Sequence, residues 1–206
     1  METKPLQVLI LNASLKHGDA PSNTEEVTEM VLNEMRALDM LKATMVRLSD
    51  KNIPVGLGYR ESEDDEWPDM VEQIIAADII LFATPIWWGG RSSLMQRVIE
   101  RMDAFDEGTV PEGRAALLNK VAGIVITGSE DGAQAVMAGI MEVLSFLNFT
   151  LPPQCCTYWV GETGLDPKTD AERRRANPAV AHMAKATARG LVHYARLAQT
   201  NPLSKH

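Results

Sequence analysis

Short polar side chains and one lysine follow the first predicted strand and continue into the start of a predicted helix. The stretch holds five candidate residues: Ser14, Lys16, Ser22, Asn23 and Thr24. The first turn of a helix has free backbone N–H groups and the positive end of the helix dipole, so it favours a phosphate or another anion. Residues 22–25 also have the pattern of a capping box, which needs no ligand. Phosphate binding and plain helix capping are therefore both open for this segment.

A second stretch, residues 84–90, places two large aromatic rings next to two glycines. It follows the apolar run Ile79–Ala83 and holds six candidate residues: Pro85, Ile86, Trp87, Trp88, Gly89 and Gly90. An apolar run without polar alternation is typical of a central parallel strand, and Pro85, which has no N–H, is expected to end it. Flat side chains beside flexible backbone suit a planar aromatic ligand, although aromatic residues after a strand also serve in cores and interfaces.

A glycine-containing turn after a later apolar strand, predicted over Val121–Thr127, is the third candidate. It holds five candidate residues: Thr127, Gly128, Glu130, Asp131 and Gly132. Backbone N–H groups in such a turn can meet the polar edge of a bound ring. The same turn can equally do no more than connect a strand to a helix, and the stretch alone does not separate these two roles.

Strands and helices alternate along the 206 residues, which predicts one α/β domain, residues 1–206, with a parallel sheet covered on both faces. Apolar runs predict strands at residues 6–11, 43–48, 79–83, 121–127 and 155–160. Helical spacing predicts helices at residues 22–38, 68–76, 93–105, 133–147 and 178–199. The first, third and fourth strands are the most continuously apolar, so they belong in the middle. The resulting order 2-1-3-4-5 is that of a flavodoxin-like three-layer sandwich.

This strand order brings the three candidate stretches to one edge of the sheet. Ligands of open α/β sheets bind outside the carboxyl ends of the strands, where the strand order reverses, here between the first and third strands. One stretch would hold a phosphate, one would lie along a ring, and one would offer backbone donors to the edge of that ring. The convergence favours a ligand more strongly than any single stretch does.

Together these stretches resemble the NADPH-dependent FMN reductase family of flavodoxin-like NAD(P)H oxidoreductases. The pattern Asn-x-Ser-x-Lys at residues 12–16, followed by Ser-Asn-Thr at 22–24, is similar to the family's FMN-phosphate loop. The sequence Ala-Thr-Pro-Ile-Trp-Trp-Gly-Gly at 83–90 resembles its flavin-ring loop, and residues 128–132 resemble its third loop. The resemblance covers about residues 6–160.

The resemblance implies an FMN-dependent NAD(P)H oxidoreductase. The residues of the first stretch would hold the FMN phosphate, Pro85 to Gly90 would line the ring, and Thr127 to Gly132 would approach its pyrimidine side. Electrons would pass from NADH or NADPH through FMN to a quinone, free flavin, nitro or azo compound, or metal complex. The cofactor supplies this chemistry, so no dedicated catalytic side chains are expected.

Two other functions compete with this one. A flavodoxin-type electron carrier, which binds FMN without oxidising NAD(P)H directly, is the alternative. A receiver-type regulator is disfavoured, because the first strand ends in Asn12-Ala13-Ser14 instead of paired acidic residues. The family resemblance further implies a homodimer or homotetramer.

The composition argues against several classes of partner. The net charge of −8 disfavours nucleic acid and anionic membrane surfaces. No apolar run reaches the ~20 residues of a membrane span, and the N-terminus lacks the pattern of a signal peptide, so a cytoplasmic location is expected.

Three further features of the sequence are expected to have structural roles outside the ligand site. The acidic run at 61–69 is expected to be a solvated loop and not a metal site. The adjacent Cys155 and Cys156 are expected to pack in a strand. Arg91 is expected to be a surface residue, with contact to a nicotinamide phosphate as the alternative.

Overall fold

The computed structural model describes residues 4–204, and a parallel sheet lies at its centre. Five parallel strands form the sheet in the order β2-β1-β3-β5-β6: β2 (Leu41–Arg47), β1 (Leu6–Asn12), β3 (Ile79–Trp87), β5 (Val121–Gly128) and β6 (Cys156–Val160). A two-residue strand, β4 (Gly90–Arg91), pairs antiparallel with the end of β3. Apart from this added hairpin, the strand order is the expected one, and the flavodoxin-like fold is confirmed.

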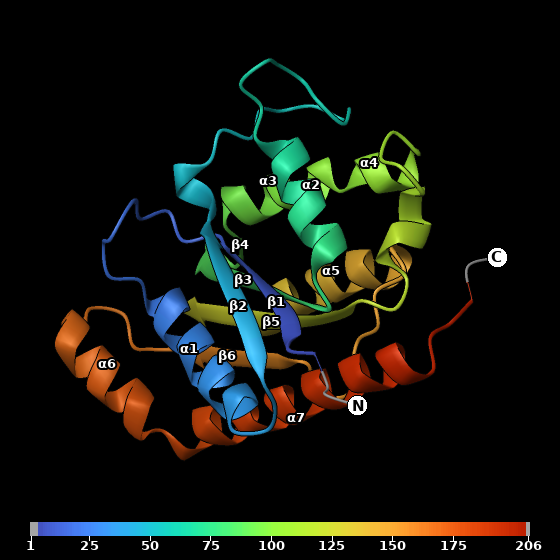
Figure 1. Ribbon diagram of the computed structural model, residues 1–206. Helices are drawn as coiled ribbons and strands as arrows, with labels where there is room; N and C mark the ends of the chain where they lie inside the picture. The colour runs from blue at the N-terminus through green and yellow to red at the C-terminus, as the bar shows by residue number, and fades with distance from the viewer. Residues whose placement is uncertain (1–3, 205–206) are drawn as a thin grey trace.

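Helices cover both faces of the sheet (Figure 1). One face is covered by α1 (Asn23–Arg36) and α7 (Pro178–Thr200), with α6 (Pro167–Ala176) beside them. The other face is covered by four helices: α2 (Trp67–Ala76), α3 (Ser93–Arg101), α4 (Asp103–Asp106) and α5 (Ala133–Phe146). Two short 3-10 turns, η1 (Leu48–Asp50) and η2 (Gly113–Leu117), lie in the connections. Among residues 4–204, no helix combines the length and apolar character that crossing a bilayer requires.

Side chains along β3 explain its continuously apolar sequence. Ile79 and Leu81 belong to the core under α1 and α7, whereas Ile80 and Phe82 belong to the core under α2, α3 and α5. Successive side chains of a strand point to opposite faces, so both faces of this central strand are buried.

The expectation that Pro85 ends this strand was wrong. β3 continues to Trp87, and Pro85 lies opposite Thr127 in the pairing with β5. The backbone of Ala83 bonds to the β1 side, where its carbonyl accepts from the N–H of Ala13. Pro85, two residues on, faces the same side just past the end of β1, so its missing N–H removes no ladder bond.

Two helices also differ from the prediction. The helix expected over residues 93–105 divides at Met102 into α3 and α4. Helix α6 was not predicted from the sequence. Its N-cap is Asp166, whose side chain accepts from two backbone N–H groups of the first turn, and Pro167 is its first residue.

Candidate functional site

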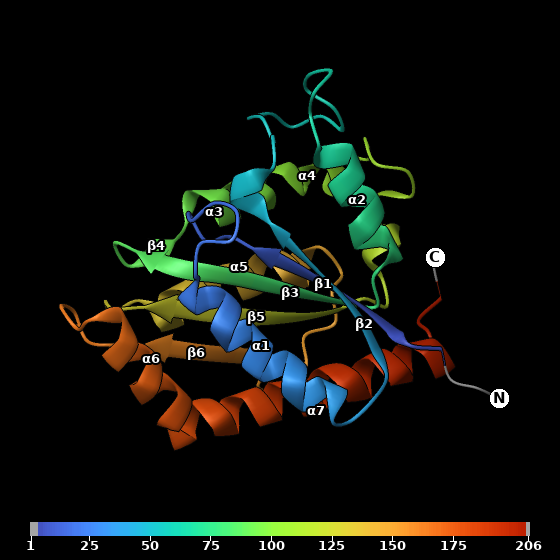
Figure 2. The same ribbon diagram turned by 60° about the vertical axis from the view of Figure 1, so that its left-hand side comes forward.

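A cleft of about 360 Å³ lies at the carboxyl end of the parallel sheet. Four segments line it: the β1–α1 loop, the end of β3, the β5–α5 loop, and the chain from β6 into α6. Figure 2 shows these segments gathered at one end of the molecule, with the chain termini at the other. A volume in the range of roughly 300 to 1,000 Å³ is typical of small-molecule sites, so the cleft can admit a ligand of cofactor size.

Most of the site residues predicted from the sequence line this cleft. Eleven do so: Ser14, Lys16, Ser22, Asn23, Thr24, Pro85, Ile86, Trp87, Thr127, Gly128 and Glu130. Five of the predicted residues lie outside the lining: Trp88, Gly89, Gly90, Asp131 and Gly132. The tertiary structure therefore brings together residues from three segments that are far apart in the sequence.

The start of α1 combines a side-chain cap with unused backbone donors. Ser22 is the N-cap, and its Oγ accepts from the N–H of Glu25 at 3.3 Å. The Glu25 carboxylate pairs with Arg47, so only one half of the expected capping box forms. Within residues 4–204, the backbone N–H groups of Asn23 and Thr24 donate to no acceptor. Ser22 therefore caps α1, and two backbone N–H groups of the first turn remain free to bind an anion.

The loop before α1 is folded by its own polar groups. The N–H of Ser14 donates to Asn12 Oδ1 at 3.0 Å, and the N–H of Lys16 donates to Ser14 Oγ at 3.3 Å. Lys16 Nζ donates to the carbonyl of Pro21 at 2.6 Å, immediately before the N-cap of α1. The lysine ammonium is therefore held at the same end of α1 as the free amides, where it adds positive charge.

The tip of the β3–β4 hairpin is a tight turn with Trp88 and Gly89 at its centre. Both have positive φ angles, 49° and 73°, as the central residues of a type I′ turn do. Trp87, just before the turn, is 49% exposed and lines the cleft. Trp88 is 89% exposed and does not, so only one of the two tryptophans predicted to wall a ring is placed to do so.

Gly132 shapes the site without lining it. A Cβ atom at this position would lie 2.8 Å from Gly89 Cα and 2.9 Å from Gly89 O. The glycine thus lets the hairpin tip approach the β5–α5 loop closely. Gly128, which does line the cleft, makes room for the Ile86 side chain of β3, because a Cβ there would lie 2.9 Å from Ile86 Cβ.

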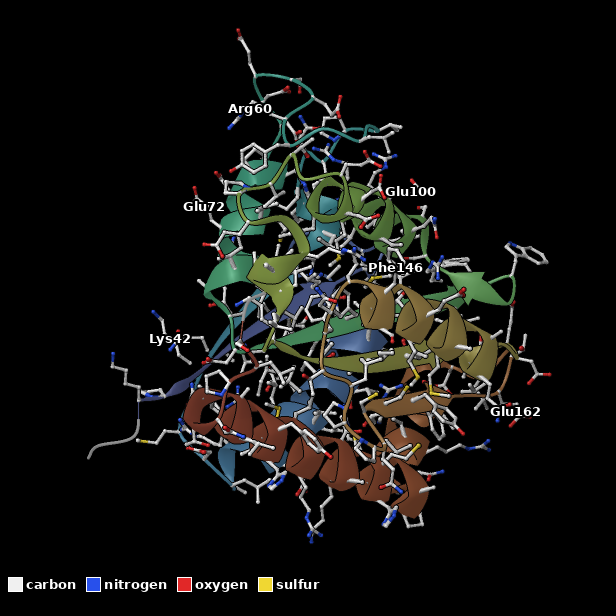
Figure 3. All side chains as sticks on the ribbon, turned by 90° about the vertical axis from the view of Figure 1, so that its right-hand side faces the viewer. Lys42, Arg60, Glu72, Glu100, Phe146 and Glu162 are labelled. Carbon is white, nitrogen blue, oxygen red and sulfur yellow. The ribbon has the colours of Figure 1, made fainter. Side chains whose placement is uncertain are left out.

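One wall of the cleft was not predicted from the sequence. Seven further residues line it: Leu15, Ser129, Glu162, Gly164, Leu165, Pro167 and Asp170. The last five belong to the segment from β6 into α6. Glu162, labelled in Figure 3, lies at the end of the sheet where the hairpin projects, whereas Lys42 lies toward the opposite end. Asp166 followed by Pro167 is a helix-start signal that could have revealed α6, although nothing in it pointed to the cleft.

The acidic run at 61–69 is not uniformly solvated, which corrects the prediction. Asp65 is fully buried and forms an ion pair with buried Arg101 of α3 at 2.9 Å. Burial raises the pKa of Asp65, but hydrogen bonds from the N–H groups of Glu61 and Trp67 and from Arg101 together hold it below its ordinary value. Arg101 also donates to backbone carbonyls between residues 54 and 59, so the pair fastens this loop to α3. In the described part of the chain, no group of three or more His, Cys, Asp or Glu residues could hold a metal ion.

The cysteines and Arg91 lie apart from the cleft lining. Cys155 and Cys156 are free and buried, but only Cys156 lies in a strand, because β6 begins there and Cys155 comes just before it. Burial raises the pKa of Cys156 to about 12, so it is a neutral thiol at physiological pH. Arg91 Nε donates to Gln96 Oε1 of α3 at 2.5 Å.

Comparison with known proteins gives a family match over most of the chain. The sequence model of the family described as NADPH-dependent FMN reductase matches residues 6–162. A crystal structure of RosB with bound 8-demethyl-8-formylriboflavin-5'-phosphate has a TM-score of 0.81 and 27% identity to this chain, covering 97% of this chain and 82% of RosB.

Two curated proteins are similar in sequence. The 8-demethyl-8-aminoriboflavin-5'-phosphate synthase of Streptomyces davaonensis is 30% identical over 171 residues, which is 79% of this chain. The divalent metal cation transporter MntH of Mycobacterium bovis is 34% identical over 166 residues, again 79% of this chain. The chain spans 66% of the synthase's length and 24% of the transporter's.

Proposed function

Because this chain belongs to the NADPH-dependent FMN reductase family, we propose that its cleft holds FMN and that the protein passes electrons from NAD(P)H to a small-molecule acceptor. FMN as cofactor and NAD(P)H as donor follow from the family. The acceptor is proposed to be a quinone, free flavin, nitro or azo compound, or metal complex, and the assembly a homodimer or homotetramer.

The observation that supports this proposal best is the set of donors at the phosphate end of the cleft. The free N–H groups of Asn23 and Thr24, the positive end of the α1 dipole and the Lys16 ammonium meet at one place. Such a set suits the phosphate monoester of FMN. In this proposal Ser14 and Ser22 add hydroxyl groups near the same oxygens.

The other end of the cleft suits a planar ring. Pro85, Ile86 and Trp87 line one side, and Thr127 to Glu130 line the side toward β5. Trp87 is half exposed, so the ring beside it would stay accessible to a second planar molecule such as a nicotinamide. Bound flavin supplies the redox chemistry, while the chain's own residues hold the phosphate, orient the ring and shape the space for the donor.

Anaerobic rapid mixing of FMN-loaded protein with excess NADH or NADPH tests this function. We expect the flavin absorbance to bleach at a rate in the range of ordinary turnover, about 1 to 1,000 per second. Absorbance that persists with both nucleotides would contradict the proposal and favour an FMN electron carrier served by a partner protein. Failure of the protein to bind FMN at all would contradict both functions.

A second candidate function takes FMN as the reactant. It rests on the similarity to the flavin-phosphate synthase and to RosB holding a formylated riboflavin phosphate. In this candidate the same cleft and the same phosphate contacts hold the flavin, and the flavin leaves chemically altered.

Mass spectrometry separates the two candidates. The protein is incubated with FMN, with and without NAD(P)H and common amino donors in air, and the flavin is then released and weighed. Unchanged FMN after many turnovers of NAD(P)H oxidation supports the oxidoreductase. A new flavin mass formed in proportion to the protein concentration supports the second candidate.

A further inference from the structure

Arg174 of α6 is fully buried and reaches the first turn of α1, which lies beside α6 in Figures 1 and 2. Its Nη1 donates to Asp170 Oδ2 at 2.6 Å on its own helix. Its Nη2 donates to Glu26 Oε2 and, at 3.5 Å, to Asn23 Oδ1. Asn23 and Asp170 both line the cleft. One buried guanidinium therefore joins the α6 wall of the cleft to the proposed phosphate segment.

Arginines pair with the two glutamates in the first turn of α1, at the phosphate end of the cleft. The first turn of α1 carries two carboxylates that would repel a phosphate, but Glu25 pairs with Arg47, and Glu26 pairs with Arg174 and Arg175. Burial raises the pKa of Glu26, and hydrogen bonds from the two arginines outweigh this effect and hold the pKa below its ordinary value. Both carboxylates therefore have cationic partners, which reduces their repulsion of an anion nearby.

The same guanidinium decides which end of the Asn23 amide is free. An asparagine side chain has one acceptor oxygen and one NH₂ donor, whereas arginine only donates. Arg174 therefore contacts Oδ1 and leaves Nδ2 as the free end. Within residues 4–204, Asn23 Nδ2 donates to no acceptor. The reverse orientation would place a donor against the guanidinium and an acceptor toward a bound phosphate, and both contacts would be unfavourable.

We propose that Arg174 is a positioning residue for the phosphate end of the cleft, because it fixes the Asn23 amide with its NH₂ group available to the phosphate of a bound flavin mononucleotide. This inference rests on the proposed function. Arg174 acts through Asn23 and not by touching the ligand. Its effect therefore concerns the phosphate monoester, and it contributes to the discrimination between FMN and riboflavin.

Ligand titrations of Arg174→Gln test this role, with dissociation constants for FMN and riboflavin taken from flavin fluorescence. We expect FMN to bind about tenfold more weakly and riboflavin to bind as in the parent, since one hydrogen bond to a charged group is lost. In an Asn23→Ala background the same substitution should weaken FMN binding less than it does in the parent, because the amide that Arg174 positions is absent and only its pairing with Glu26 is lost. Arg189→Gln, which removes an exposed charge from α7, is the matched control and should alter neither constant.

Asn23→Asp tests the same idea while Arg174 stays in place, in case Arg174→Gln does not fold. An aspartate has only acceptor oxygens, so the one that Arg174 does not hold would repel the phosphate. We expect Asn23→Asp to bind FMN more weakly than Asn23→Ala, with riboflavin binding equal in the two.

Three results would overturn the inference: equal losses for FMN and riboflavin in Arg174→Gln, an undiminished loss in the Asn23→Ala background, or tighter FMN binding by Asn23→Asp than by Asn23→Ala. A parent protein that binds no FMN would instead overturn the proposed function on which the inference rests.

Discussion

Thr24 Oγ1 and Thr127 Oγ1 lie 2.8 Å apart, and this buried hydrogen bond joins the start of α1 to the end of β5. Both residues line the cleft. The bond therefore connects the proposed phosphate segment to the proposed ring segment. The Thr24 hydroxyl can therefore contribute to stability through this bond and to ligand binding through the cleft, and substitutions at the two threonines distinguish these contributions.

Thr24→Val should lower both stability and FMN affinity. It leaves the Thr127 hydroxyl buried without its partner, which costs ~1–3 kcal/mol of unfolding free energy. Adding Thr127→Val removes both partners and should restore most of that stability, because two apolar groups of the same shape leave no polar group unpaired. Urea unfolding measures stability, and FMN titration should show that affinity stays low in the double variant. Parent-like FMN affinity in Thr24→Val would exclude a phosphate contact by this hydroxyl.

Trp88→Asn should stabilise the protein by about 1 kcal/mol. A tryptophan at positive φ is strained, asparagine tolerates that conformation well, and a side chain that is 89% exposed loses little burial on replacement. Thermal unfolding measures the gain, and FMN titration should give the parent's affinity. Trp87→Ala is the comparison, because Trp87 lines the cleft and its loss should weaken FMN. A large loss of FMN affinity in Trp88→Asn would show that this ring closes over the ligand.

Gly132→Ala should lower stability and weaken FMN together. Its Cβ would lie within 3 Å of the Gly89 backbone, and its φ of 131° is strained for an alanine. We expect a loss of about 1–3 kcal/mol as the hairpin tip moves away from the β5–α5 loop. Gly108→Ala is the control, since its φ is also positive but a Cβ there meets nothing within 4 Å. Equal effects of the two substitutions on FMN binding would argue against a role for the close approach.

Asp65→Asn should destabilise the protein by roughly 3–5 kcal/mol at neutral pH, because it leaves Arg101 buried without its anionic partner. The folded-state pKa of Asp65 lies below its ordinary value, so its contribution is fully present above the unfolded pKa of about 3.9 and fades as pH falls through the folded pKa. The difference in unfolding free energy between parent and variant should therefore narrow in acid. Urea unfolding as a function of pH measures it, with Glu72→Gln on exposed α2 surface as the neutral control. A difference that does not change down to the lowest folded pH would contradict the ionised pair.

Cys156 should resist thiol reagents in the native protein. Burial, and then the neighbouring Cys155, raise its pKa to about 12, and burial also raises the pKa of Cys155. Little thiolate therefore exists at pH 8, so both cysteines should react with a disulfide reagent only after unfolding in denaturant. Because an unfolded cysteine ionises near pH 8.5, this burial should also make stability fall with rising pH above that value. Rapid labelling of the native protein at pH 8 would point to a reactive thiol instead.

The sequence by itself determined the parallel sheet, its order and three of the four cleft segments. Continuous apolar runs such as Ile79–Ala83 occur where both faces of a strand are covered, and β3 is such a strand. The more polar second strand lies at the sheet edge, as its composition indicated. The helix-start pattern after Ser22 depends on local hydrogen bonds, so it too could be predicted from neighbouring residues.

Only the tertiary structure decided the contacts that join distant segments. Pro85 fits inside β3 because β1 has already ended beside it, and a proline's effect on a strand depends on that neighbour. Asp65 is buried because Arg101 lies opposite it, although its acidic surroundings indicated a solvated loop. The α6 wall has a polar, charged sequence with no local sign of a cleft. Arg174 holds α6 against α1 through Asn23 and Glu26, which lie about 150 residues earlier in the chain. These partners come close to Arg174 only when the sheet has formed.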